Sequence, residues 1–181
     1  MVDLRSNPYE NDNFDRSTHA SHAYLLNQAI NQFNQARWQG LLEKAKCILL
    51  RQAQFLFDLE LIPQSQVRAR RYGEFKPVSL DHICGTLGRT GDFDQRFHPL
   101  EDRLRDRWVS IAIARSQNTP LEPVALIQVG DRYFVKDGHH RISVARTRGE
   151  SAIDAEITLW DVAGSLPWEK QTSHGVLPQT A

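Results

Sequence analysis

The stretch Arg132–Gly149, RYFVKDGHHRISVARTRG, decides the fold that we predict for this chain. It opens with an extended run, continues through the turn pair Asp137-Gly138, and ends in a short amphipathic helix that Gly149 closes. A strand, a glycine turn and the start of a helix present backbone N–H groups to an anion. We therefore predict an anion site at this corner and regard the rest of the chain as its scaffold.

The composition indicates one domain with an appendage and sets limits on its partners. The chain has 181 residues, 40% of them hydrophobic, so a packed core is expected without disulfides or metal. The 22 basic and 22 acidic residues cancel, so bulk charge does not predict binding to nucleic acid or to a membrane, although a local cluster lies at 68–71. Cys47 and Cys84 form neither a disulfide framework nor a zinc motif. The N-terminus lacks the apolar region of a signal peptide, and no run approaches the roughly 18 apolar residues of a membrane span, so we expect a cytoplasmic protein.

The pattern along the chain predicts five segments. They are a flexible tail at 1–21, a helical region at 22–62, a basic connector at 63–74, an α+β domain at 75–160 and a second flexible tail at 161–181. The helical region has apolar residues at three- and four-residue steps, and Gly40 either kinks it or divides it. Part of this helix is apolar on more than one side, which leaves two partners open: the domain itself, or a second copy in a homodimer. The connector is either a solvated linker or a small patch that contacts phosphate.

Within the domain, the sequence predicts alternating strands and helices. We expect strands at 75–80, 124–129, 132–136 and 153–159, helices at 100–116 and 140–148, a Gly130-Asp131 hairpin turn, and a glycine-rich loop at 85–91. The glycine loop lacks the Gly-Lys-Ser/Thr ending of a Walker motif.

The corner after the third of these strands carries an unusual charge. Cations in the first turn of a helix conflict with the positive end of its dipole, and a bound phosphate would resolve the conflict. The predicted phosphate-binding residues are Gly138, His139, His140 and Arg141, with Arg89 from the glycine loop. The alternative is that Asp137 caps the helix while the histidines are packed or solvated. A metal site is not predicted, because adjacent histidines do not share a helix face.

The segment Lys136–Ala145, KDGHHRISVA, resembles the phosphate-binding segment of the ParB N-terminal-like, or ParB/sulfiredoxin, superfamily. The surroundings are similar too: Val78–Ile83, a helix, Pro123–Ile127, a hairpin, the motif and a closing strand. The resemblance covers about 75–159. It implies an α+β fold in which a small mixed sheet is packed with helices, preceded here by the long N-terminal helical region.

Members of this superfamily differ in what occupies the motif. Partition proteins carry a Gly-Glu-Arg-Arg type segment, bind CTP and act as clamps on DNA; this chain lacks room for their DNA-reading and dimerisation domains, so phosphate contact carries over and CTP specificity does not. Sulfiredoxins place a reactive cysteine where this chain has His139, so sulfiredoxin activity is not expected. ADP-dependent free-serine kinases have a similar Asp-Gly-His turn and need a carboxylate from another loop. Asp81, Asp92, Asp94 and Glu101 are the candidates here.

Three functions therefore remain open. The first is a bacterial, cytoplasmic nucleotide-binding module with a binding or regulatory role, which takes CTP, ATP or ADP with or without Mg²⁺ and is compatible with DNA association. The second is a phosphotransferase or nucleotide hydrolase, with Asp137 as base or magnesium ligand and His140 steadying the phosphoryl group. The third is an interaction protein that dimerises through its N-terminal helix.

Overall fold

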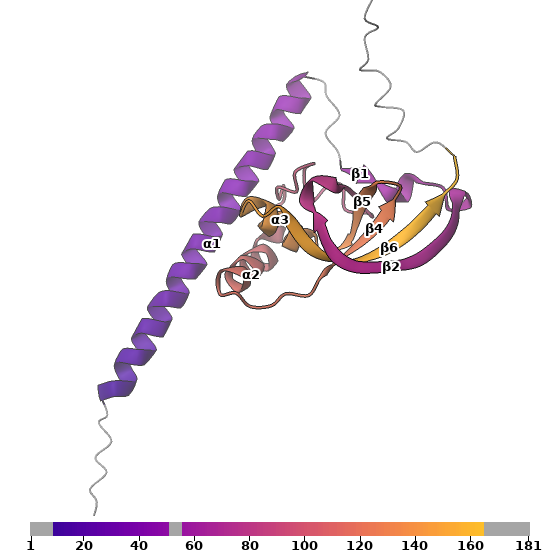
Figure 1. Ribbon diagram of the computed structural model, residues 1–181. Helices are drawn as coiled ribbons and strands as arrows, with labels where there is room; N and C mark the ends of the chain where they lie inside the picture. Colours follow the sequence, from indigo (N-terminus) through magenta and orange to yellow (C-terminus); the bar gives the residue numbers. More distant parts are fainter. Residues whose placement is uncertain (1–8, 51–55, 165–181) are drawn as a thin grey trace, which may run out of the picture.

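A mixed sheet with helices gathered on one side forms the protein (Figure 1). The computed structural model describes residues 9–50 and 56–164. Its main elements are α1 (Tyr9–Leu50), β1 (Phe57–Asp58), β2 (Val67–Ser79), β3 (Ile83–Thr86), α2 (Arg105–Ser116), β4 (Val124–Val129), β5 (Arg132–Asp137), α3 (His139–Thr147) and β6 (Ala152–Val162). Short 3-10 turns lie at Leu59–Leu61, Gln64–Gln66, Leu80–His82 and Asp102–Leu104. The predicted α+β class, with a mixed sheet, packed helices and a long helix before them, is confirmed.

The strand order β1-β3-β5-β4-β6-β2 brings the candidate site to one end of the sheet. The β4–β5 hairpin lies at the centre, and Gly130 makes its turn with φ 62°. Strands β3 and β5 are parallel, with Thr86 opposite Val135. Because parallel strands end at the same edge of a sheet, the loop after β3 and the start of α3 meet there.

Each face of the sheet buries its own apolar cluster. On the helical face, Phe33 of α1, Trp108 of α2 and Ile142 of α3 are completely buried in one core. The rings of Phe33 and Trp108 meet edge to face at 5.7 Å, so α1 is packed into the same core as the sheet. The other face is covered by the segment that follows β1, with Leu59, Ile62, Ile127, Val129 and Phe134 at its centre.

The predicted elements from α2 onward are confirmed. The strands β4, β5 and β6, the helices α2 and α3, and the hairpin turn all lie where the sequence places them, within a few residues at each end. Gly149 has φ +73° just after α3, as expected of a glycine that ends a helix.

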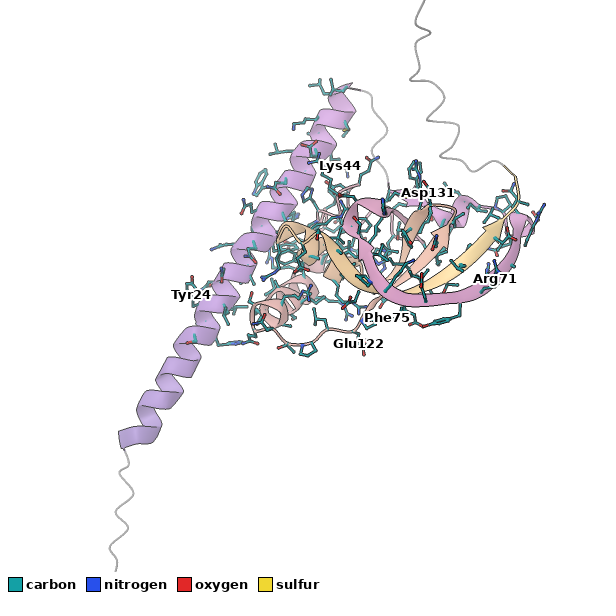
Figure 2. The ribbon with its side chains drawn as sticks, in the orientation of Figure 1. Tyr24, Lys44, Arg71, Phe75, Glu122 and Asp131 are labelled. Carbon is teal, nitrogen blue, oxygen red and sulfur yellow. The ribbon has the colours of Figure 1, made fainter. Side chains whose placement is uncertain are left out.

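The basic connector predicted at 63–74 is wrong as a description of local structure. Most of it is the first half of β2, which pairs antiparallel with β6 over Val67–Ser79 and forms the outer strand of the sheet (Figures 1 and 2). Its polar composition follows from this position, because many of its side chains, including Arg71, Tyr72 and Phe75, are exposed. The boundaries between domains stay a prediction.

The limits of the N-terminal helix also differ from the prediction. Helix α1 spans Tyr9–Leu50, so residues 9–21 are helical rather than a tail. Residues 51–55 of the predicted helical region lie outside the described part, and residues 57–61 form β1 and a 3-10 turn instead of an α-helix. Helix α1 runs through Gly40, whose added Cβ would lie 3.0 Å from the Cβ of His98, so the glycine permits a close approach rather than a division. Residues 1–8 and 165–181 lie outside the described part, and Asp161 and Val162 of the predicted second tail belong to β6. In the described ranges, no helix is both long and apolar enough to cross a membrane.

Candidate anion site at the start of helix α3

Gly138 joins β5 to α3 in a conformation that needs glycine. Its φ is +97°, a region that side-chain-bearing residues rarely adopt. An added Cβ would lie 2.5 Å from Cγ1 and 2.8 Å from Cβ of Val124, which is fully buried on β4. The tight packing at Gly138 therefore sets where the first turn of α3 starts.

The first turn of α3 is uncapped and opens into a cavity. The first helical hydrogen bond joins the Ile142 N–H to the Gly138 carbonyl, so the preceding N–H groups have no partner within the helix. Among the described residues, no side chain caps α3, so the alternative in which Asp137 caps this helix is wrong. The turn lies beside a cavity of about 310 Å³ (here the helix cavity), which is lined by Arg89, Arg107, Ile111, Asp137, Gly138, His139, His140 and Arg141.

His139 ties α3 to the neighbouring strand. Its Nε2 lies 2.6 Å from the hydroxyl of Thr86, at the end of β3, and its ring stacks on Phe93 with centroids 6.0 Å apart. Burial, with a smaller contribution from the charge of Arg89, lowers the pKa of His139 to about 4. The residue is therefore neutral near pH 7.

His140 is also buried and neutral but less completely satisfied. Burial, followed by the charges of Arg107 and Arg89, lowers its pKa to about 4. Its ring meets Phe93 edge to face at 5.6 Å. Its Nδ1 is buried without a hydrogen-bond partner in the described part of the chain. An unpaired buried polar atom is costly, and His140 lines the cavity, so its Nδ1 is available to a ligand there.

Arg141 is held largely by the protein itself. Its Nη1 donates to the carbonyls of Glu122 (2.5 Å) and Pro123 (3.0 Å), and its Nη2 donates to Asp137 Oδ2 at 2.7 Å. The Arg141 side chain is 11% exposed, whereas that of Asp137 is 70% exposed. Arg141 therefore fastens the loop before β4 to α3 and offsets the charge of Asp137.

Two arginines from other elements add positive charge to the cavity. Arg89, predicted from the glycine loop, is brought to the cavity, and its Nη1 lies 3.9 Å from Asp92. Arg107, on α2, was not predicted as a site residue. It arrives there because α2 packs against α3, where Nε1 of Trp108 donates to the Ser143 hydroxyl at 2.9 Å. In the sequence, Arg107 is distinguished only by its place directly before the core residue Trp108.

The carboxylates considered for catalysis have other roles or other places. Asp94 accepts hydrogen bonds from the N–H groups of Arg96 (2.9 Å) and His98 (2.8 Å) and from the His98 ring, and so shapes its own loop. Asp92 is paired with Arg103. Asp81 and Glu101 are exposed and are not among the described residues that line the helix cavity. Asp137 is the carboxylate that the structure brings to this cavity.

The arginine cluster of the expected connector lies elsewhere. On β2, the guanidinium of Arg70 stacks over the ring of Trp160 at 4.3 Å. Among the described lining residues of the helix cavity, none comes from β2. The cluster is thus a feature of the outer strand and not part of the candidate anion site.

Comparisons with known proteins assign no family to this chain. No family model matches this chain, and a search of the curated proteins gives no match. Among solved structures, the crystal structure of sulfiredoxin from Arabidopsis thaliana is similar over 58% of this chain and 100% of that chain, at 20% sequence identity and a TM-score of 0.35. A likeness of that size supports no functional argument.

Proposed function

We propose that the helix cavity binds the phosphate groups of a nucleotide, and that the protein is a nucleotide-binding module with a binding or regulatory role. The observation that carries the proposal is the uncapped first turn of α3, which faces a cavity shared with Arg89 and Arg107. Backbone N–H groups at a helix start, joined by guanidinium groups, make a favourable site for phosphate.

The charge of the cavity favours an anion. Its described lining has three arginines and one carboxylate, and both histidines are neutral, which leaves a formal charge of +2 (three minus one). Asp137 is paired with Arg141, and Arg89 lies 3.9 Å from Asp92, which Arg103 also contacts. Among the described residues, Arg107 is the lining arginine without an ion pair. A phosphate would contact Arg107 and Arg89 without breaking the pair between Arg141 and Asp137.

A neighbouring cavity makes a nucleotide a better candidate than phosphate alone. This second cavity, of about 620 Å³, shares Arg107, Ile111, Asp137 and Arg141 with the helix cavity. The rest of its lining is partly apolar and includes Ala114, Pro120 and Leu121. Ligand sites commonly combine an apolar wall with a few polar groups, so this space suits a sugar and base beyond the phosphates.

Phosphoryl transfer is the second candidate, because Asp137 lies in the cavity. A carboxylate oxygen is a ligand that magnesium accepts, and the Asp137 side chain is 70% exposed. His140, with a pKa near 4, is a weak general base at neutral pH. Binding without turnover is therefore the function that the geometry supports best.

Calorimetric titration with CTP, ATP and ADP, with and without Mg²⁺, tests the proposal. We expect binding of at least one nucleotide, weakened about 10- to 100-fold by Arg89→Ala or Arg107→Ala, since each removes a charge-assisted contact. Arg71→Ala is the matched control, because Arg71 is an exposed arginine of β2 and should leave affinity unchanged. Absence of heat with every nucleotide refutes the proposal. Phosphate release that Asp137→Ala abolishes while binding persists would favour the second candidate.

A further inference from the structure

Helix α1 has two opposite faces, and only one of them meets the domain. The inner face is buried and consists of Ala29, Phe33, Ala36, Gly40 and Cys47. On the opposite side, Trp38 is 66% exposed, Leu42 56% and Leu49 83%. Large apolar side chains in a row on a surface mark an interaction site more often than scattered ones do.

The exposed residues belong to a regular stripe along the helix. Steps of four and three residues connect Tyr24, Gln28, Asn31, Gln35, Trp38, Leu42, Ala45 and Leu49, which we call the outer seam. This is the 3.5-residue repeat of a coiled coil. None of its eight positions is charged, although 24% of the chain is charged. The outer seam therefore has the spacing and polarity of a helix–helix contact.

We propose that a second copy of α1 packs on the outer seam in parallel, so that the protein is a homodimer. In a parallel pair, each seam position meets its own copy. The amides of Gln28, Asn31 and Gln35 then face amides, and the apolar half from Trp38 to Leu49 faces an apolar half. In an antiparallel pair centred on the seam, Asn31 would face Leu42, which buries an amide against an aliphatic side chain without a partner.

The positions beside the seam favour the same pairing. Leu41 and Ile48 widen its apolar half, and Ile48 is 73% exposed. Lys46, on the other flank, is paired with Glu43 of its own helix at 2.7 Å. In a parallel pair Lys46 lies opposite Leu41 of the other copy, where its aliphatic stem can cover the leucine. No like charges meet among these described flanking residues.

The geometry of the fold leaves room for the second copy. The domain lies against the inner face of α1, so the outer seam points away from it (Figure 1). The described chain ends after β6, on the side of the sheet away from α1 (Figure 1). In a parallel pair, the outer seam of a second copy places amides against amides and apolar residues against apolar residues, so a second copy is the partner that fits this surface. This inference does not rest on nucleotide binding.

Light scattering of the full chain at micromolar concentrations is the first test. We expect twice the monomer mass of 20.8 kDa. Leu42→Glu should produce monomers, and the milder Leu42→Ala should raise the dissociation constant about 100-fold, because both copies lose a buried leucine. Lys44→Glu is the matched control, since Lys44 is exposed on α1 but lies off the seam. A monomer at every concentration, or a dimer that Leu42→Glu leaves intact, overturns the proposal.

Disulfide cross-linking tests the seam and its direction without disturbing the fold. Ala45→Cys should cross-link to its own copy under mild oxidation, whereas Lys44→Cys and the unsubstituted chain, which carries Cys47 and Cys84, should not. An Ala45→Cys variant that cross-links only when mixed with a Gln28→Cys variant would show an antiparallel pair and refute the parallel arrangement. Circular dichroism of each variant confirms that it is folded.

Discussion

Replacing Gly138 with alanine is the sharpest test of the geometry at the start of α3. Two separate penalties apply to this substitution. The φ of +97° lies in a left-handed region, which costs a residue with a Cβ about 1–2 kcal/mol. The new methyl group would also sit 2.5 Å from Cγ1 of Val124, and such overpacking typically costs about 1–3 kcal/mol.

Together the two penalties predict a loss of about 2–5 kcal/mol in the free energy of unfolding. At about 3 °C per kcal/mol for a chain of this length, the melting temperature should fall by roughly 6–15 °C. Gly149→Ala is the matched control: Gly149 also has a positive φ, of +73°, but nothing lies within 4 Å of its added Cβ. It should lose only the backbone part, roughly 3–6 °C.

Thermal and urea unfolding of both variants measure the difference. Val124→Ala removes Cγ1, the nearer of the two Val124 atoms that the new methyl group meets, so the double variant should lose less stability than the sum of the two single variants. If Gly138→Ala is no less stable than Gly149→Ala, or if the two changes at Gly138 and Val124 simply add, the close packing of the turn against β4 is refuted.

Three further predictions follow from other contacts. His139 and His140 have folded-state pKa values of about 4, below the ordinary 6.5, so the unfolded chain binds more protons between these values, and stability is present above pH 6.5 and falls as the pH drops towards 4. Unfolding free energies measured across this range should fall by as much as roughly 3 kcal/mol per histidine, and His139→Gln should reduce the slope. Arg141→Lys should lower stability by about 1–3 kcal/mol in urea unfolding, because an ammonium cannot reproduce the fork that binds two carbonyls and a carboxylate. Phe33→Ala should cost about 3–5 kcal/mol and lower the melting temperature of the sheet as well as of α1, and separate transitions for the two would contradict their shared core.

The sequence predicted the part of the fold that short-range signals determine. The β4–β5 hairpin, α3 and its end at Gly149 follow from a turn dipeptide, alternating apolar residues and a terminal glycine. The second half of β2 was predicted as the strand at 75–80, but its first half was missed. This half pairs with β6 on one side only and carries exposed side chains on both faces, which removes the alternation that identifies a strand.

In the candidate site, too, the sequence predicted the residues that carry local signals and missed those that long-range packing brings in. Gly138 and Arg89 carried local signals, from a glycine turn and a glycine-rich loop. Arg107 did not, because it reaches the cavity through the packing of α2 on α3. The bond between His139 and Thr86 joins residues 53 positions apart, so the neutral, tethered state of that histidine was also beyond what the sequence shows.

The outer strand β2 bears on how this protein avoids pairing with other sheets. An open strand edge is a template for intermolecular β-pairing and aggregation. Over its thirteen residues, β2 shifts register twice against β6, between Val67 and Ala69 and between Tyr72 and Phe75, and Pro77 has no N–H to donate. Each interruption twists or breaks the row of free backbone groups, so an incoming strand meets only short stretches that it can match. We therefore expect the unsubstituted chain to form no fibrils in a fibrillation assay. A variant in which Pro77 is substituted and one bulge is removed should form fibrils that begin at this edge.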